Sequence, residues 1–151
     1  MKYVFALAMG ILLALTTLGC AAKADYSEIA SKEWRLIEVK QDGKEVKIDR
    51  KTLESEGFEN AFVVVFENDR ISGVGTANRF FAPYETNANA IRISPIASTR
   101  AASVKEPKAL KEREFFSLLQ NARQCVINAG KLEILTKNGA GKKAELIFEG
   151  I

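Results

Sequence analysis

The sequence predicts an α+β domain in which a curved antiparallel β-sheet, forming a partial barrel, wraps around one α-helix. Three observations predict this fold. Apolar runs of strand length recur along the chain, turn residues separate these runs, and a single helical pattern follows Pro107. The order of strands, one helix and then more strands indicates that both groups of strands contribute to the same sheet.

The first 19 residues are typical of a signal peptide that ends before Cys20. Lys2 is followed by an apolar run from Val4 to Leu15, which is short for a membrane span. The small residues before Cys20 resemble the bacterial lipobox, although Thr17 stands where that motif usually has leucine. The resemblance implies acylation of the Cys20 thiol, with chains such as palmitate, and cleavage before this cysteine.

Two other interpretations of the N-terminus remain open, namely an ordinary secretory signal and an uncut anchor. With acylation, residues 20–31 would be the lipidated cysteine and its polar tether, and residues 32–151 the folded domain. The lipid would hold the domain in the cell envelope, facing the periplasm or the cell surface. Ala21 in place of aspartate favours the outer membrane over the inner one.

The segments expected to form strands are rich in β-branched and aromatic residues, and turn residues bound them. They are Glu33–Val39, Lys44–Ile48, Ala61–Phe66, Ile71–Val74, Asn78–Thr86, Ile91–Ile93, Gln124–Ile127, Leu132–Thr136 and Ala144–Phe148. Ala61–Phe66 is apolar on both faces and should be central and covered. Pro83 limits its strand to an edge or a bulge, and Gly73 and Gly75 permit a bulge or a close backbone approach. Arg50–Glu59 is expected to be a loop with at most a helical turn.

The one expected helix opens at Pro107, because proline is tolerated in a first helical turn. Apolar residues recur at helical spacing and should face the core; they are Leu110, Phe115, Leu118, Leu119 and Ala122. Residues on the other face should be solvated; they are Lys111, Glu112, Arg113 and Gln120. Phe116 lies off the stripe, as its flank or as an exposed contact.

Composition excludes several classes of function. The chain has no histidine, which removes histidine-based triads and most zinc sites, and no cofactor or metal motif is present. With 22 basic and 19 acidic residues, the charge is too balanced to indicate nucleic-acid binding. If Cys20 is acylated, Cys125 has no partner for a disulfide and should be a buried structural thiol.

Three stretches follow one another in an order similar to the META domain, the family of the heat-shock protein HslJ. They are Trp34–Leu36, Phe66–Tyr84 with Gly73 and Asn78, and Ile93–Ala102 followed by Glu114-Phe115 and Leu118-Leu119. The resemblance covers about residues 32 to 150. It implies a β-rich domain around one helix, an envelope role linked to heat shock, stress tolerance or virulence, and no assigned enzyme activity. The fold is also similar to that of lipidated pilotins.

The sequence departs from the family at two cysteine positions. Ala77 stands at the first and Ser103 near the second, while Ala101 replaces a methionine that family members carry between them. The joint loss is coherent if the two cysteines normally pair. Functions that need these thiols are therefore not expected here.

The candidate ligand and motif residues each have a structural alternative. Asn78 and Arg79 either form part of a ligand site or, for Asn78, adopt an unusual backbone angle and bond nearby amides. Thr99 and Arg100 precede the helix, where Arg100 either clamps an anion or makes a structural ion pair or a bond to a carbonyl group. The aromatic group Phe80, Phe81 and Tyr84 forms either core packing or the mouth of an apolar groove.

These observations lead to one main hypothesis and two alternatives. We expect a non-enzymatic envelope lipoprotein that holds an acyl chain or an amphipathic peptide segment of an envelope protein between helix and sheet. The alternatives are a stress-related structural protein that acts through its surface, and a hydrolase that uses carboxylates such as Glu112 and Glu114. A continuous apolar cavity would favour the first, a solid core the second, and convergent buried carboxylates the third.

Overall fold

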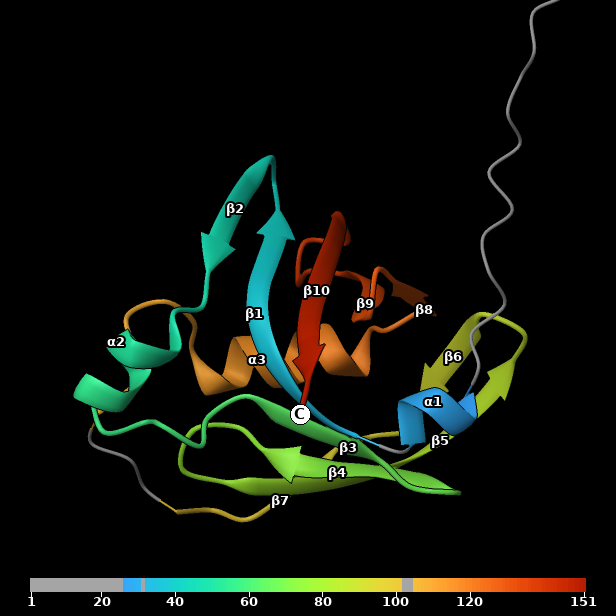
Figure 1. Cartoon of the computed structure of the whole chain (residues 1–151), viewed down its shortest axis with the longest axis horizontal. Coiled ribbons are helices and arrows are strands. Elements are labelled where there is room, and N and C mark those ends of the chain that lie inside the picture. The colour runs from blue at the N-terminus through green and yellow to red at the C-terminus, as the bar shows by residue number, and fades with distance from the viewer. Residues whose placement is uncertain (1–25, 31, 102–104) are drawn as a thin grey trace, which may run out of the picture.

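Eight antiparallel strands close into a barrel in the computed structural model, which describes residues 26–30, 32–101 and 105–151 (Figure 1). Around the ring they are β1 (Glu33–Gln41), β10 (Lys143–Gly150), β9 (Lys131–Lys137), β8 (Gln124–Asn128), β6 (Ala90–Ile93), β5 (Arg79–Asn87), β4 (Arg70–Val74) and β3 (Val63–Phe66). Two short strands flank the ring: β2 (Lys44–Lys47) pairs with β1, and β7 (Ala97–Ser98) pairs with β5. The strands expected from the sequence are confirmed with small shifts of their ends.

The expectation of a partial barrel is wrong, because the first and last strands of the ring pair with each other. The β1–β10 ladder runs from Trp34 opposite Gly150 to Gln41 opposite Ala144, with a register shift between Leu36 and Glu38. This irregularity bends β1, so that its first half also pairs with β3 and its second half with β2. The barrel is held less firmly between β6 and β8, which share only one ladder pair, Ala90 with Gln124.

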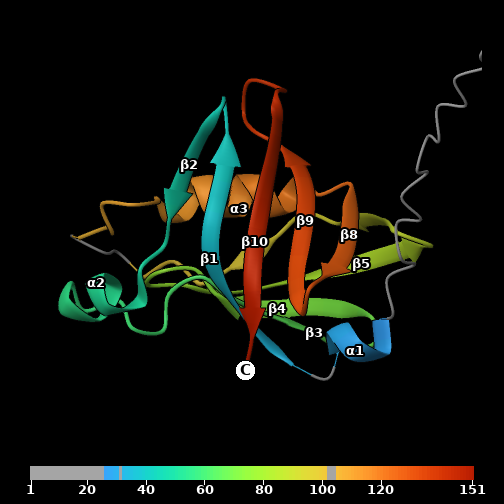
Figure 2. The ribbon, with the colours of Figure 1, turned by 45° about the horizontal axis from the view of Figure 1, so that its top comes forward.

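Three helices accompany the barrel: α1 (Tyr26–Ala30), α2 (Arg50–Ser55) and α3 (Glu112–Gln120). Helix α3 begins later than the expected Pro107, with Lys111 as its N-cap. Figure 2 shows α3 running behind β1 and β10, and its buried face is formed by Phe115, Leu118 and Leu119, as the sequence predicts. No helix within the described residues is long and apolar enough to cross a membrane.

Helix α1 lies in the range that the sequence assigned to the tether. Its five residues lie inside the range 20–31, yet Ile29 is fully buried and Tyr26 packs against the core. The indole Nε1 of Trp34 donates a hydrogen bond of 2.8 Å to the carbonyl of Ile29, which ties α1 to β1. Residues of α1 therefore pack with the domain, ahead of the expected start at residue 32. Cys20 and the expected signal peptide lie outside the described residues.

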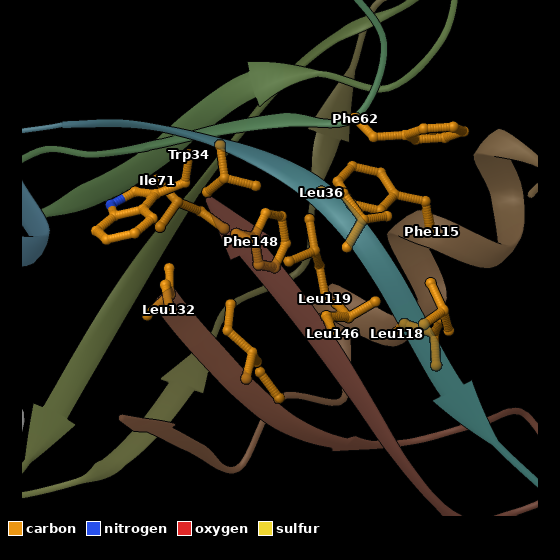
Figure 3. Close-up of a cluster of buried hydrophobic side chains, with 14 of the residues drawn as sticks. Trp34, Leu36, Phe62, Ile71, Phe115, Leu118, Leu119, Leu132, Leu146 and Phe148 are labelled. Carbon is orange, nitrogen blue, oxygen red and sulfur yellow. The ribbon is translucent and has the colours of Figure 1, made fainter. Parts of the chain in front are cut away.

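The barrel interior is filled by large apolar side chains from the strands and from α3 (Figure 3). Fully or almost fully buried members include Trp34, Leu36, Phe62, Phe66, Phe115, Leu118, Leu119, Leu132 and Phe148. Leu118 also accepts a hydrogen bond at its carbonyl from Thr136 Oγ1 at 2.5 Å, so helix and sheet are joined by a polar contact within this core. The packing leaves α3 and the surrounding strands in direct contact.

Candidate functional site

The turn between β4 and β5 carries a carboxylate at its centre. The backbone N–H groups of Thr76, Ala77 and Asn78 all donate to Oε1 of Glu112, with N···O distances of 2.7, 3.1 and 2.9 Å. Successive amides that point at one anion form a backbone nest, which is a common way of binding an oxyanion. Here the first residue of α3 occupies the nest, so the turn is fastened to the helix.

The Asn78 side chain extends this arrangement to the segment after β7. Its Nδ2 donates to Glu112 Oε2 at 2.7 Å, and its Oδ1 accepts from Thr99 Oγ1 at 2.9 Å and from the Ala101 amide at 2.7 Å. Asn78 is only 8% exposed. We call Asn78, Thr99, Ala101 and Glu112, with the amides of residues 76–78, the Asn78–Glu112 cluster.

The expectation that Glu112 is solvated is wrong for this reason. Partial burial raises the pKa of the Glu112 carboxyl, but the hydrogen bonds from Asn78 and from the amides of Thr76, Asn78 and Ala77 outweigh it and lower the pKa. The carboxylate is therefore the stable form in the folded protein. All its strong contacts are with the chain itself, which is the geometry of a structural clamp.

Of the two structural features expected for Asn78, an unusual backbone angle and bonds to nearby amides, only the second is present. It bonds nearby amides as expected, but it is not among the described residues with positive φ. The positive φ in this region belongs to Phe62, whose amide donates to the carbonyl of Gly75 at 2.7 Å. The close approach expected at Gly73 is confirmed, because a Cβ there would lie 2.0 Å from the carbonyl oxygen of Val63.

Two of the aromatic candidates, Phe80 and Tyr84, lie in different parts of β5. Phe80 is 3% exposed and packs edge-on against Phe115 and Phe116 of α3, at centroid distances of 6.1 and 5.2 Å. Tyr84 lies near the other end of β5, where its hydroxyl donates to the carbonyl of Glu67 at 2.8 Å and its ring meets Phe66. Burial raises the pKa of Tyr84. Both residues serve core packing, and Phe116 proves to be the flank of the helix stripe.

Arg79 and Arg100 are exposed, and within the described residues neither guanidinium makes a hydrogen bond or ion pair. Arg79 and Thr99 are joined through the backbone, since the Thr99 amide donates to the Arg79 carbonyl at 3.0 Å. The structural ion pair expected for Arg100 is thus not formed with the described part of the chain. The structure brings Gly73, Asn78, Arg79, Phe80 and Thr99 near one another, but leaves Tyr84 apart.

The described residues form neither a metal site nor a reactive thiol. No group of three or more histidine, cysteine or acidic residues among them is placed to hold a metal ion. Cys125 is fully buried, and burial raises the pKa of its thiol to about 12, which keeps it protonated at neutral pH. The structural role expected for this thiol matches its position in the core.

Three residues with structural roles escaped the sequence reasoning. Gln120, also expected to be solvated, donates from Nε2 to the Ile93 carbonyl at 3.0 Å and accepts from the Ile96 amide at 2.8 Å. Arg50 binds the carbonyls of Ala61 and Leu36 at 2.6 and 2.8 Å. Like Glu112, both side chains satisfy backbone groups where strand pairing is interrupted. Helical periodicity places Gln120 and Glu112 opposite the apolar stripe and gives no sign of these contacts.

Comparison with known proteins supports the fold. A protein from Burkholderia xenovorans, solved by NMR, is similar with a TM-score of 0.55 and 13% identity, covering 99% of this chain and 97% of that one. A crystal structure of a DUF4847 family protein from Bacteroides vulgatus has a TM-score of 0.53 and 15% identity, covering 80% and 93%. No curated protein matches the sequence at a significant level. The META domain family matches residues 27–147, and the chain belongs to this family.

Proposed function

We propose that this chain is a non-enzymatic envelope lipoprotein whose META domain acts through its outer surface, as a structural or interaction module in envelope stress tolerance. The observation that carries this proposal is the filled interior. Phe115, Leu118 and Leu119 of α3 are between 0% and 1% exposed and lie directly against the strands.

The filled interior supports interaction through the surface over enclosure of an acyl chain. An acyl chain between helix and sheet would have to displace side chains that are already buried there, and protein cores are close-packed. Three hollows lined by described residues are open to solvent and lie on the outside of the barrel. These features support surface interaction over enclosure of a ligand.

The hydrolase alternative receives no support from the carboxylates that suggested it. Glu112 is held by the Asn78–Glu112 cluster with a lowered pKa, whereas a general acid needs a raised one. Glu114 accepts a hydrogen bond from Gln41 Nε2 at 2.6 Å and thereby links α3 to β1. Both carboxylates serve the contact between helix and barrel.

The lipid anchor is tested by the intact mass of the protein purified from its native membrane, beside a Cys20→Ala variant. We expect a chain that starts at Cys20 and carries acyl groups, and a variant that is released or unprocessed. A mature chain without lipid would overturn the anchor.

The surface mode is tested separately by native mass spectrometry with palmitate. Wild-type protein should bind none. Leu119→Ala, which opens a cavity in the same core, serves as a positive control for access. Stoichiometric palmitate on the wild type would restore the enclosed-ligand hypothesis.

A further inference from the structure

The outer face of β3 is more apolar than a barrel surface requires. Val64 and Phe66 point inward and are 0% and 1% exposed, while Val63 and Val65 alternate with them on the other side of the strand; Val65 is half-buried and Val63 is 7% exposed. Strands with one solvated face normally alternate apolar and polar residues. The sequence therefore predicts a covered strand, yet Val63 and Val65 line an open hollow on the outside of the barrel.

Neighbouring strands continue this surface. In the ladders, Val65 lies opposite Ser72, Ser72 opposite Phe81, and Phe81 opposite Ala97. Phe81 is 52% exposed and separates two hollows of about 420 and 230 Å³. We call this surface, formed by Val65, Val74, Phe81 and Ala97, the β3–β5 face. Strands β3 and β4 are seen along the lower side of the molecule in Figure 1.

Arginines surround the β3–β5 face. Arg70 and Arg79 line the larger hollow, and Arg35 lies beside Val63 in the β1–β3 ladder. Glu67 pairs with Arg70, and Glu33 pairs with Arg35 at 3.8 Å. The Arg79 guanidinium is exposed and has no partner among the described residues. An apolar surface with arginines at its rim is complementary to an anionic lipid surface.

The N-terminus emerges close to this face. Helix α1 contacts β3, and Glu33, the first residue of β1, pairs with Val65 of the face. Cys20 precedes Tyr26 by six residues, which span at most about 20 Å. Phe81 lies three strands from β1, which is about 14 Å across the sheet. A lipid on Cys20 would therefore leave the β3–β5 face within reach of the bilayer.

We propose that the β3–β5 face docks on the surface of an anionic membrane, with Phe81 inserted among the headgroups and Arg79 bound to lipid phosphates. The inference rests on the lipid anchor of the proposed function, which would supply most of the affinity and leave the face to set orientation. Phenylalanine contributes apolar burial at the interface, and arginine keeps its charge at headgroup level while its stem covers apolar surface.

The test uses residues 21–151, which include the entire barrel, held on vesicles by an N-terminal histidine tag and a nickel-chelating lipid. This tether does not depend on native acylation, so the result stands apart from the mass measurement that tests the anchor. An environment-sensitive dye is placed on Phe81→Cys or, as a matched control, on Leu135→Cys. Leu135 is a 38% exposed residue of β9, and the native Cys125 is fully buried and remains unlabelled.

On vesicles that contain phosphatidylglycerol, the dye at position 81 should shift its emission to the blue and be quenched by brominated acyl chains. The dye at position 135 should do neither. Arg79→Glu should lower the docking equilibrium about tenfold, because it replaces an attraction to anionic lipid by a repulsion. Circular dichroism of each variant checks that the barrel is intact.

Four results would overturn the proposal. Position 81 could remain in water on the anionic vesicles, or both positions could respond equally. Equal docking on phosphatidylcholine alone would remove the role of Arg79. Energy transfer between labelled copies in solution, without vesicles, would instead assign the face to a second copy of the chain.

Discussion

Replacing Glu112 by alanine removes the acceptor for three backbone amides and for the Asn78 side chain at once. A hydrogen bond to a charged group contributes about 1.5–3 kcal/mol, but water can replace the contacts of the exposed part of the turn. Ala77 is exposed, whereas Asn78 is buried, so the amide and the Nδ2 of Asn78 dominate the loss. We expect the free energy of unfolding to fall by about 3 kcal/mol.

The Glu112→Gln variant removes the charge of the side chain while nearly keeping its shape. Glutamine keeps one oxygen for the backbone amides, but its NH₂ group would face the Nδ2 of Asn78. Asn78 cannot turn its amide to adapt, because its Oδ1 already accepts from Thr99 and Ala101. The loss should be about half that of the alanine variant, or roughly 1.5 kcal/mol.

Urea unfolding at several pH values measures both effects, with Glu54→Ala on the exposed side of α2 as the matched control. Because the folded pKa of Glu112 lies below its ordinary value of 4.5, its stabilisation is complete above the unfolded pKa and is lost as the pH falls through the folded pKa. The difference in free energy of unfolding between wild type and Glu112→Gln should therefore be largest at neutral pH and decrease below about pH 4. A difference in free energy of unfolding below about 0.5 kcal/mol at neutral pH would refute the role of the cluster, and so would a difference that does not change with pH.

Three further predictions follow from close contacts. Gly75→Ala should cost about 2 kcal/mol, because its Cβ would lie 2.5 Å from Glu112 Oε1 and 2.8 Å from Phe116 Cζ, while Gly139→Ala, with no atom within 4 Å, should unfold like wild type in the same urea assay. Cys125 should react with a thiol reagent at pH 8 only at the rate of unfolding, since its pKa is about 12 and it is fully buried; fast reaction of native protein would contradict this. Gln120→Ala should speed hydrogen exchange at the Ile96 amide, measured by NMR, and an unchanged rate there would show that another acceptor protects it.

Much of the strand pattern could be predicted because it is local. Period-two apolar patterns and turn pairs such as Asp42-Gly43 mark strand ends, and this pair does adopt positive φ. Pro83 also behaves as its chemistry requires, since it lies at the break where β5 changes partner from β6 to β7. These features depend on neighbours in sequence.

Closure of the barrel and the polar contacts of the site are not local. Nothing near Trp34 signals that it pairs with Gly150, because register between distant strands is set only when the whole sheet forms. Glu112 and Gln120 satisfy backbone groups that become unpaired only in the tertiary structure. Helix α1 could not be predicted from the sequence, because five residues are too few to show a helical period.

The pairing of β1 with β10 also governs when the domain can fold. The ladder joins strands from distant parts of the chain, so β1 can pair early with β2 and β3 but cannot pair with β10 until Lys143–Gly150 has been synthesised. Contacts between such distant segments close a long loop and slow folding. The topology therefore delays closure of the barrel until residues 143–150 are available to pair with β1.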